Sequence, residues 1–449
     1  MSKTFPVDNG MPSFWRSQPD PLDNHRSTET LPETSDIVII GAGFAGASTA
    51  YHCLDQSNDS TKPSIMVLEA RQACSGATGR NGGHLKPDLY NSIGDWAAEY
   101  GVEAAAEVAA FEMQNLEALE SLIEAKKIDC DLELSEVFDV HLDNDYCAKV
   151  KARYETLIAS GFDISKKVQF SPQEAAEAVS GVKGAKGCFS SRTGRLWPYK
   201  LVMQLLKQAI SAGANLQTNT PVLSVSESPN DDGRWTVTTS RGSILAKWVV
   251  FASNAYTSAI APEYKDRIVP VRGICSHIAI PNPPTTPIRS SYTLRSKSWD
   301  YDYLIPRPDG SIVVGGAKST YLSNTENWYD NTDDSRLIDS AAAYFNDYMQ
   351  RNFHGWENTG ANADHVWTGI MGFTPDSLPH VGHIPNKQGQ LVIAGFNGHG
   401  MPQVFLCARG ISRMIVDGAK YEDTGLPKLF QTTPKRLERL MDVRQAMAE

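Results

Sequence analysis

Three glycines and one acidic residue near the N-terminus have the types and spacing of a dinucleotide site. Gly41, Gly43 and Gly46 follow a short apolar strand, and Glu69 closes the next apolar run, residues 65–68. In such a strand–turn–helix unit, amides of the turn and of the helix N-terminus approach a pyrophosphate, while the acid binds the ribose hydroxyls. This order predicts a bound dinucleotide. The alternative is an ordinary βαβ unit that contains a glycine turn.

A second glycine-rich turn lies near the C-terminus. An apolar strand, residues 390–395, runs into the sequence GFNGHGM (395–401), and a helix follows. The reduced isoalloxazine ring carries negative charge near its pyrimidine edge, which a helix N-terminus stabilises. Nicotinamide enzymes rarely need such a turn, so the two turns together favour FAD. An ordinary helix start is the alternative for this turn taken alone.

The composition is that of a globular protein with room for two domains. The 449 residues include 52 acidic and 42 basic side chains, for a net charge of −10, and contain no basic block with interleaved aromatic residues. A nucleic-acid partner is therefore not expected. The seven cysteines are scattered without a C-x-x-C pair, which argues against a zinc site or a disulfide framework. Without a signal peptide or a membrane-spanning run, we expect a cytoplasmic protein with no membrane partner.

The rest of the chain predicts the elements that must position these turns. Prolines and small polar residues in segment 1–35 indicate an extended N-terminal arm that wraps the surface. Apolar residues at helical spacing predict helices at 102–127, 200–212 and 334–353. Alternating or apolar runs between them predict strands, which include 268–280, 301–305 and 311–315.

Five ordered motifs accompany the first unit (GAGFAG with Glu69). They are SGATGRNGGH (75–84), VVFASNAYT (249–257), YLIPRPDG (303–310), WTGIMGFTPDSLPHVG (367–382) and GFNGHGM. On these motifs the chain resembles the D-amino-acid oxidase superfamily of flavoproteins, in the branch that contains glycine, sarcosine and γ-glutamylputrescine oxidases. The segment 13–35 further looks like fungal members of this branch.

The resemblance implies an α/β fold in which an FAD-binding, Rossmann-like domain is joined to a second, mixed-sheet substrate domain. We expect the FAD-binding domain to comprise residues 36–95, 170–265 and 365–430, and the substrate domain to comprise 96–169 and 266–364. A helical tail is expected at 431–449. The chain thus weaves between the two domains.

The resemblance also supplies candidate residues for FAD. The expected cofactor-binding positions are Gly41, Gly43, Phe44, Ala45, Gly46, Glu69, Ala70, Arg71, Ser75, Thr78, Arg80, Asn81, Gly82, Gly83, His84, Val222, Ser253, Asn254, Gly369, Asn397, Gly398, His399, Gly400 and Met401. The loop 75–83 would pass close to the flavin ring, since its glycines suit a backbone that lies flat against a planar ligand. Arg80 would offer a donor there, or form a surface salt bridge instead.

Three positions depart from well-known members of the family. Gly369 stands where sarcosine oxidases have the cysteine that bonds covalently to the flavin, so that linkage is absent; His84 is the other residue that could form one. Met371 matches the arginine with which glycine oxidase binds the substrate carboxylate, and a thioether cannot neutralise a carboxylate. Val313 matches the oxygen-activating lysine of sarcosine oxidase. Lys318, Lys86 and His399 are the alternative sources of positive charge.

The implied reaction is oxidation of a C–N bond of a small amine or N-substituted amino acid to an imine, by hydride transfer to flavin N5, with molecular oxygen as a possible acceptor. Candidates at the substrate face are His399, Tyr303, His84 and Met371, of which His399 is preferred because the glycines beside it force its turn near the flavin. The pair His380 and His383 lacks a carboxylate or cysteine companion, so no metal is expected. The rival hypotheses are a flavin monooxygenase, whose usual G-D dipeptide is missing from GFNGHG, and a flavin-binding protein without turnover.

Overall fold

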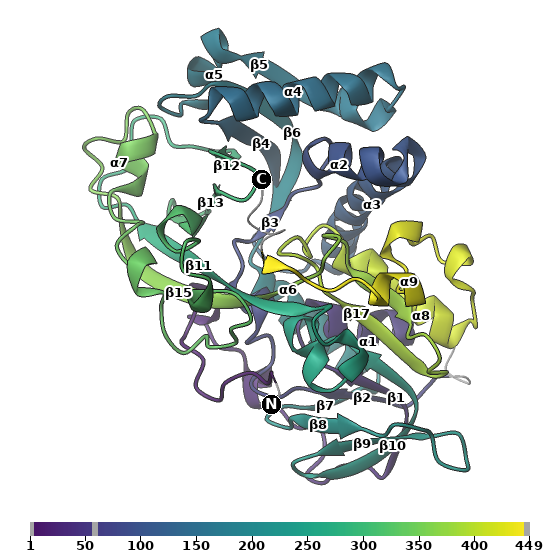
Figure 1. The fold of residues 1–449 in the computed structure, drawn as a ribbon. Coiled ribbons are helices and arrows are strands. Elements are labelled where there is room, and N and C mark those ends of the chain that lie inside the picture. The colour runs from purple at the N-terminus through teal and green to yellow at the C-terminus, as the bar shows by residue number, and fades with distance from the viewer. Residues whose placement is uncertain (1–3, 56–61, 444–449) are drawn as a thin grey trace.

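The computed structural model describes residues 4–55 and 62–443 of the chain. Residues 1–3 of the expected arm and 444–449 of the expected tail lie outside the described residues. Two β-sheets organise the molecule, one in the lower and one in the upper half of Figure 1. The predicted α/β fold with two sheets is confirmed.

The first sheet has eight strands, with the path β16-β17-β10-β1-β2-β7 and with β8 and β9 beside β10. Its core strands run parallel, from β17 through β10 and β1 to β2 and β7. The strands are β1 (Thr34–Ile40), β2 (Ile65–Leu68), β7 (Asn215–Gln217), β8 (Val222–Val225), β9 (Trp235–Thr239), β10 (Gly242–Phe251), β16 (His380–His383) and β17 (Gln390–Ala394). The central strands are buried apolar runs, as expected of a parallel sheet covered by other layers.

The second sheet has nine strands in the order β15-β11-β14-β13-β12-β4-β6-β3, with β5 paired to β6. It is mixed, because β12 and β4 are parallel while the other neighbours are antiparallel. The strands are β3 (His84–Leu85), β4 (Glu133–His141), β5 (Gln169–Pro172), β6 (Gly187–Arg195), β11 (Val269–Ala279), β12 (Ser291–Arg295), β13 (Tyr301–Pro306), β14 (Ile312–Gly316) and β15 (Asn362–Phe373). Strands β3, β6 and most of β15 come from segments expected in the FAD-binding domain.

Helices pack around both sheets. They are α1 (Phe44–Asp55), α2 (Asn91–Tyr100), α3 (Val102–Lys126), α4 (Asn144–Ala159), α5 (Gln173–Ser180), α6 (Pro198–Ser211), α7 (Tyr348–Asn352), α8 (Val404–Val416) and α9 (Pro434–Leu437). Helix α1 packs between α6 and α8 beside the first sheet, and α4 and α5 lie over β4 and β6 at the top of Figure 1.

The helix predicted at 334–353 is wrong. The segment is mostly turns and a short 3-10 helix, and only its end forms α7. Tertiary contacts override the helical periodicity: Asp334 is buried against Arg71, and Asp347 adopts a left-handed conformation with φ of 51°. The tyrosines 344 and 348 instead turn toward the buried carboxylate of Asp302, to which both hydroxyls donate hydrogen bonds.

The N-terminal arm is packed more deeply than a surface segment. Trp15 is fully buried, and its indole N–H donates to the carbonyl of Asn81 at 2.5 Å. The amide of Met11 donates to the carbonyl of Asp334, while the carbonyl of Met11 accepts from Arg80 Nη2 at 2.7 Å. The arm is therefore bound to the loop that carries residues 75–83.

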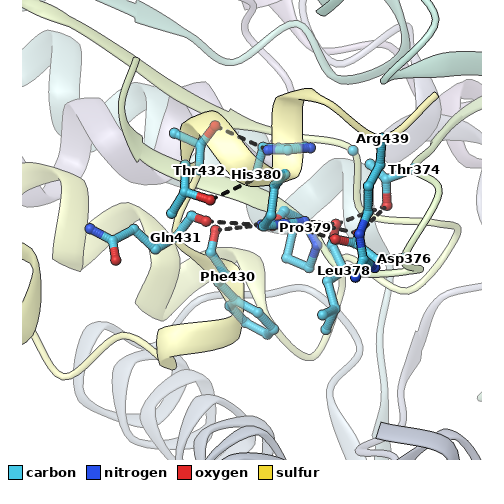
Figure 2. Close-up of polar contacts among 12 residues, drawn as sticks. Thr374, Asp376, Leu378, Pro379, His380, Phe430, Gln431, Thr432 and Arg439 are labelled. Atoms are coloured by element: carbon cyan, nitrogen blue, oxygen red, sulfur yellow. Dashed lines mark hydrogen bonds and ion pairs between the residues drawn. The ribbon is translucent and has the colours of Figure 1, made fainter. Parts of the chain in front are cut away.

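The C-terminal segment binds the turn that follows β15 (Figure 2). Arg436 donates from Nε and Nη2 to the two carboxylate oxygens of Asp376, at 2.8 and 3.0 Å. The same guanidinium donates to the carbonyls of Leu378, Pro379, Phe430 and Gln431. Nearby, His380 Nδ1 lies 3.0 Å from the hydroxyl of Thr432. This bidentate pair, here called the Arg436–Asp376 clamp, closes the C-terminal segment onto residues 374–380.

Replacing Arg436 by alanine should lower the free energy of unfolding by about 3–5 kcal/mol, because it leaves the mostly buried carboxylate of Asp376 without its cation. Burial favours the neutral acid, but the Arg436 charge and its hydrogen bonds outweigh that effect and lower the pKa of Asp376. The clamp is thus fully formed above the ordinary carboxyl pKa of about 4, and its contribution is lost as the pH falls further. Denaturant titrations at several pH values measure the difference.

Arg439→Ala is the matched control, since Arg439 lies partly exposed beside the exposed Glu99. Its replacement should cost less than about 1 kcal/mol. Equal losses in the two variants would contradict the clamp.

Candidate functional site

The two glycine turns line one cavity, although they lie about 350 residues apart in the chain. The cavity runs along the ends of β1, β2 and β10 and reaches β15 and the turn after β17. Seventeen of the predicted cofactor-binding residues line it: Gly41, Gly43, Phe44, Ala45, Glu69, Ala70, Arg71, Thr78, Arg80, Asn81, Val222, Ser253, Asn254, Gly369, Gly398, Gly400 and Met401. We call it the first cavity.

Glu69 fixes the first glycine turn. Its Oε2 accepts the amide N–H of Ala42 and its Oε1 accepts that of Arg71, both at 2.9 Å. A side chain at Gly46 would overlap the carbonyl oxygen of Gly41, so only glycine lets α1 start this close to β1. The carboxylate therefore joins the turn after β1 to the end of β2, and its remaining lone pairs face the cavity region where a ribose is expected.

The second turn is held by side-chain amides. Asn397 has φ of 53°, its Oδ1 accepts the amide of Thr374 at 2.7 Å, and its Nδ2 donates to the carbonyl of Gly395 at 2.7 Å. Asn254 Oδ1 accepts the amide of Gly395 at 2.9 Å. Thr374 lies two residues before Asp376, so the Arg436–Asp376 clamp fixes the segment to which Asn397 is hydrogen-bonded.

Arg80 is buried and links several segments of the chain, so it does not form the surface salt bridge expected as its alternative role. Its guanidinium donates to the carbonyls of Ser75, Thr368 and Met11 at 2.7–2.8 Å, and its Nε lies 3.4 Å from Asp334. Burial lowers the pKa of Arg80 to about 10, while the charge of Asp334 opposes the shift. Arg80 thus ties the 75–83 loop, the arm and β15 together at the wall of the first cavity.

The first cavity fits FAD. Its lining is mainly glycine backbone and apolar side chains, and a Cβ built on Gly76 would meet nothing within 4 Å. The buried hydroxyl of Tyr256, which lines the same wall, has no hydrogen-bond partner among the described residues. An extended, flat ligand would fit the open space beside Gly76, and its polar groups would give the Tyr256 hydroxyl a hydrogen-bond partner. The residues that would hold it are those of the two turns, Glu69 and the 75–83 loop.

A second cavity adjoins the first. Five residues border both: Asn81, Tyr303, Phe396, Gly398 and Met401. The second cavity is far more polar, and its lining includes Lys86, Asp88, Asp139, Arg295, Lys318 and His399. A substrate in it would meet the cofactor across the shared wall.

His399 forms an ion pair at the edge of the second cavity. Its Nε2 lies 2.9 Å from Oε2 of Glu112, a fully buried residue of α3 that also accepts from Gln403 Nε2 at 2.6 Å and from the amide of Asp88. Burial favours the neutral imidazole, but Glu112 outweighs it and raises the pKa of His399. His399, one-third exposed, therefore borders the cavity with an imidazole whose protonated form Glu112 favours.

Sequence reasoning missed Glu112. Its position carries a signal, because Val108 and Leu116, one turn before and after it on the same face of α3, are fully buried. A charged residue in the middle of an apolar helical stripe requires a partner. The partner, His399, lies 287 positions away and could not be read from the pattern.

The other candidates at the substrate face occupy different places. Tyr303 borders both cavities, wedged between Gly82 and Gly315, and its hydroxyl lies 3.2 Å from Cys275 Sγ. Met371 lines the first cavity beside Gly398. His84 lines the second cavity only; burial lowers its pKa to about 3, so the ring is neutral.

Some predicted cofactor positions do not line the first cavity. Gly82, His84, Asn397 and His399 border the second cavity, while Gly46, Ser75 and Gly83 support the loops from behind. Val313 is buried in the core of the second sheet. Residues of the first cavity that the sequence did not single out include Phe5, Pro6, Tyr256 and Cys275. Phe5 and Pro6 belong to the arm, whose docking has no local signal.

Two further observations concern the residues that the structure describes. None of their histidine, cysteine and acidic side chains gather in threes at a place that could hold a metal ion. Their helices are also too short or too polar to cross a membrane.

Comparison with known proteins decides the family. The profile of the DAO family, described as FAD dependent oxidoreductase, matches residues 36–414. The chain belongs to this family. FAD is accordingly its cofactor, and the protein is an FAD-dependent oxidoreductase. The likeness of segment 13–35 to fungal members stays a prediction.

Individual relatives are distant. Gamma-glutamylputrescine oxidoreductase of Escherichia coli (strain K12) is 23% identical over 410 residues, which cover 88% of this chain and 87% of that protein. The structure of glycine oxidase from Geobacillus kaustophilus has a TM-score of 0.67 at 19% identity and covers 87% of this chain and 96% of its own. For L-amino acid deaminase from Proteus vulgaris the TM-score is 0.68 at 16% identity, with 94% and 98% covered. The fold is shared at these low identities.

Glu69→Ala should raise the dissociation constant of FAD by roughly 10- to 100-fold, since hydrogen bonds to charged groups are worth about 1.5–3 kcal/mol. The variant loses both the ribose acceptor and the two amide bonds that fix the turn. Titration of the FAD-free protein with FAD, followed by flavin fluorescence, measures the change. Asp36→Asn, at the opposite end of β1, is the control and should bind FAD as the unmodified chain does; an unchanged affinity in Glu69→Ala would refute the assignment.

Proposed function

We propose that the protein oxidises the C–N bond of a small amine or N-substituted amino acid to an imine. The observation that carries the proposal is the wall shared by the two cavities, where Tyr303, Gly398 and Met401 face both sides. When bound, FAD would supply at N5 the acceptor for the hydride that leaves the carbon bearing the nitrogen. The nitrogen then gives up a proton, and water hydrolyses the imine to a carbonyl compound and an amine or ammonia. Two relatives, gamma-glutamylputrescine oxidoreductase and a glycine oxidase, are named for the oxidation of an amine and of an amino acid, which supports this reaction class.

The apolar wall between the cavities favours the neutral amine that hydride transfer requires, because burial disfavours a substrate ammonium and so lowers its pKa. The charges of His399 and Lys86 add little to this effect, since they are paired with Glu112 and Asp139. Tyr303 and the apolar shared wall position the reacting carbon and exclude water. These are the main contributions that a protein makes to hydride transfer to a flavin.

Met371 points to the kind of substrate. It stands in the first cavity where an arginine would bind the carboxylate of a simple α-amino acid, and the two arginines that line this cavity, Arg71 and Arg80, are engaged by Asp334 and by backbone carbonyls. An amine, or an amino acid substituted at nitrogen, needs no cation beside the reacting carbon. The buried Val313 likewise leaves His399 and the two lysines as the charges that could assist electron transfer to oxygen.

Anaerobic mixing of the FAD-loaded protein with a panel of primary and secondary amines should bleach the flavin absorption band for at least one of them, with release of one carbonyl product per flavin reduced. Reoxidation in air then separates an oxidase from a dehydrogenase. Flavin reduction by NADPH with hydroxylation of a substrate would instead identify a monooxygenase, and a flavin that no amine reduces would indicate a protein without turnover.

Glu112→Gln should lower the pKa of His399, because it removes the negative charge that favours the protonated imidazole. The alkaline limb of the pH profile of flavin reduction should therefore move to lower pH, and NMR titration of the imidazole should show the same shift. Stability supplied by the pair is present below the ordinary histidine pKa of about 6.5 and is lost as the pH rises through the folded value. The control Glu117→Gln, exposed on the same helix, should leave both profiles in place; coincident profiles for Glu112→Gln and the unmodified enzyme would contradict the role.

A further inference from the structure

The second cavity contains two cations gathered around one aromatic ring. Lys318 Nζ lies 4.3 Å from the ring centroid of Tyr301 and 5.0 Å from that of Trp299. Arg295 Cζ lies 4.6 Å from the ring centroid of Tyr301. All four side chains line the second cavity and none lines the first. We call this group the cationic corner.

The hydrogen-bonding capacity of Arg295 is only partly used. Its Nε donates to Oδ1 of Asp139 at 2.7 Å, and its two Nη atoms have no hydrogen-bond partner among residues 4–55 and 62–443. The two Nη atoms are not among the solvent-inaccessible polar atoms that lack a partner in the described residues. They therefore remain accessible from the cavity. A guanidinium held at Nε with both Nη groups free can bind a carboxylate through its outer edge.

Among the described residues no carboxylate oxygen lies within 4 Å of Lys318 Nζ, and the ammonium lies over the two aromatic rings. Placed there, the ammonium is the largest cause of a lowered pKa for the phenol of Tyr301. The corner therefore carries one ammonium, that of Lys318, without a carboxylate partner among the described residues, beside a guanidinium that shares Asp139 with Lys86.

The acids that line the same cavity are already engaged. Asp139 accepts from Lys86, Tyr90 and Arg295, so one carboxylate serves two cations. The remaining four bind backbone amides or other cations, namely Asp88 with the amides of residues 90–92, Asp95 with Arg153, Glu99 with Arg439 and Asp376 with Arg436. An anion in the cavity would thus meet Arg295 and Lys318 without displacing a protein carboxylate.

The corner stands apart from the wall where the two cavities meet. Tyr303 forms part of that wall, and the Tyr301 ring centroid lies 6.4 Å from the Tyr303 centroid on the side of the second cavity. Arg295 and Lys318 gather around Tyr301. A ligand that touches the wall with one end and the corner with the other must therefore be elongated.

We propose that Arg295 and Lys318 bind a carboxylate at the end of the substrate remote from the C–N bond that is oxidised. The substrate is then an elongated amine with a terminal carboxylate, such as an ω-amino acid or an amino acid whose oxidised substituent is carried on a long side chain. The inference rests on the proposed function, and it agrees with the absence of a cation at Met371. The anion is recognised from the far side of the cavity instead of beside the reacting carbon.

The test compares 5-aminopentanoate with pentylamine, which share chain length and amine but differ in the terminal carboxylate. The FAD-loaded enzyme should reduce its flavin with a kcat/KM at least about 10-fold higher for 5-aminopentanoate. The ratio of the two kcat/KM values should fall about 10-fold or more in Arg295→Gln and in Lys318→Met. Arg192→Gln, an exposed arginine on β6, is the control and should keep the ratio of the unmodified enzyme.

Binding of pentanoate, which cannot be oxidised, supplies a second measurement that does not depend on turnover. Calorimetry should show pentanoate bound by the unmodified holoenzyme and bound about 10-fold more weakly by Lys318→Met, a variant that breaks no hydrogen bond described in the fold. It remains informative if Arg295→Gln fails to fold because Asp139 loses a partner.

The outcomes separate the two proposals. Equal kcat/KM values for the two amines, or pentanoate binding that is the same in all variants, overturn the cationic corner and leave C–N oxidation standing. If neither amine reduces the flavin while pentanoate binds in a Lys318-dependent way, the anion site stands and the proposed oxidation of this substrate class fails.

Discussion

The site depends on the parallel pairing of β1, β10 and β17. Strands that run parallel present their carboxyl ends at one edge of the sheet, and ligands of open α/β sheets bind outside that edge. The turns that leave these three strands carry Gly41–Gly46, Ser253–Asn254 and Gly395–Gly400, and all three line the first cavity. If β1 or β17 ran in the opposite direction, its turn would lie at the other edge of the sheet. The placement of the three turns around one cavity therefore depends on the parallel direction of the strands.

The two cavities beside that edge differ in the residues that line them. The first cavity is built from backbone and apolar side chains, so its hydrogen bonds to a ligand come mainly from main-chain groups and from Glu69. The second contains many charged side chains, which come from the other sheet, from α2 and from the loops beside them, and each of its acids already binds a cation or backbone amides. Tyr303, packed between two glycines, stands at the boundary. Glycine is thus required as much to make room for an aromatic ring as to permit a turn.

Much of the cofactor site could be predicted from the sequence because its signals are local. The strand and the glycines of each turn follow one another within a few residues, Glu69 closes the next strand after the first turn, and the apolar stripe of α3 could be read in the same way. The second cavity could not be predicted, because it joins Glu112 to His399 and Arg295 to Asp139 across long separations. The prediction of a helix at 334–353 is wrong for the same reason: Asp334 binds Arg71 and Tyr344 binds Asp302, and both partners are far away in the sequence. The arm, whose Trp15 is buried against the 75–83 loop, has no periodic pattern from which its docking could be inferred.

The Arg436–Asp376 clamp bears on when the site can form during biosynthesis. The amide of Thr374 donates a hydrogen bond to Asn397 in the second glycine turn. Arg436, far downstream in the sequence, binds Asp376 in the same segment as Thr374. Because the chain is synthesised from its N-terminus, Arg436 has not yet been made when the first βαβ unit emerges from the ribosome. The second half of the cofactor pocket is therefore fixed late in synthesis, and a nascent chain carries its first nucleotide-binding turn for most of that time without the part that would enclose the ligand.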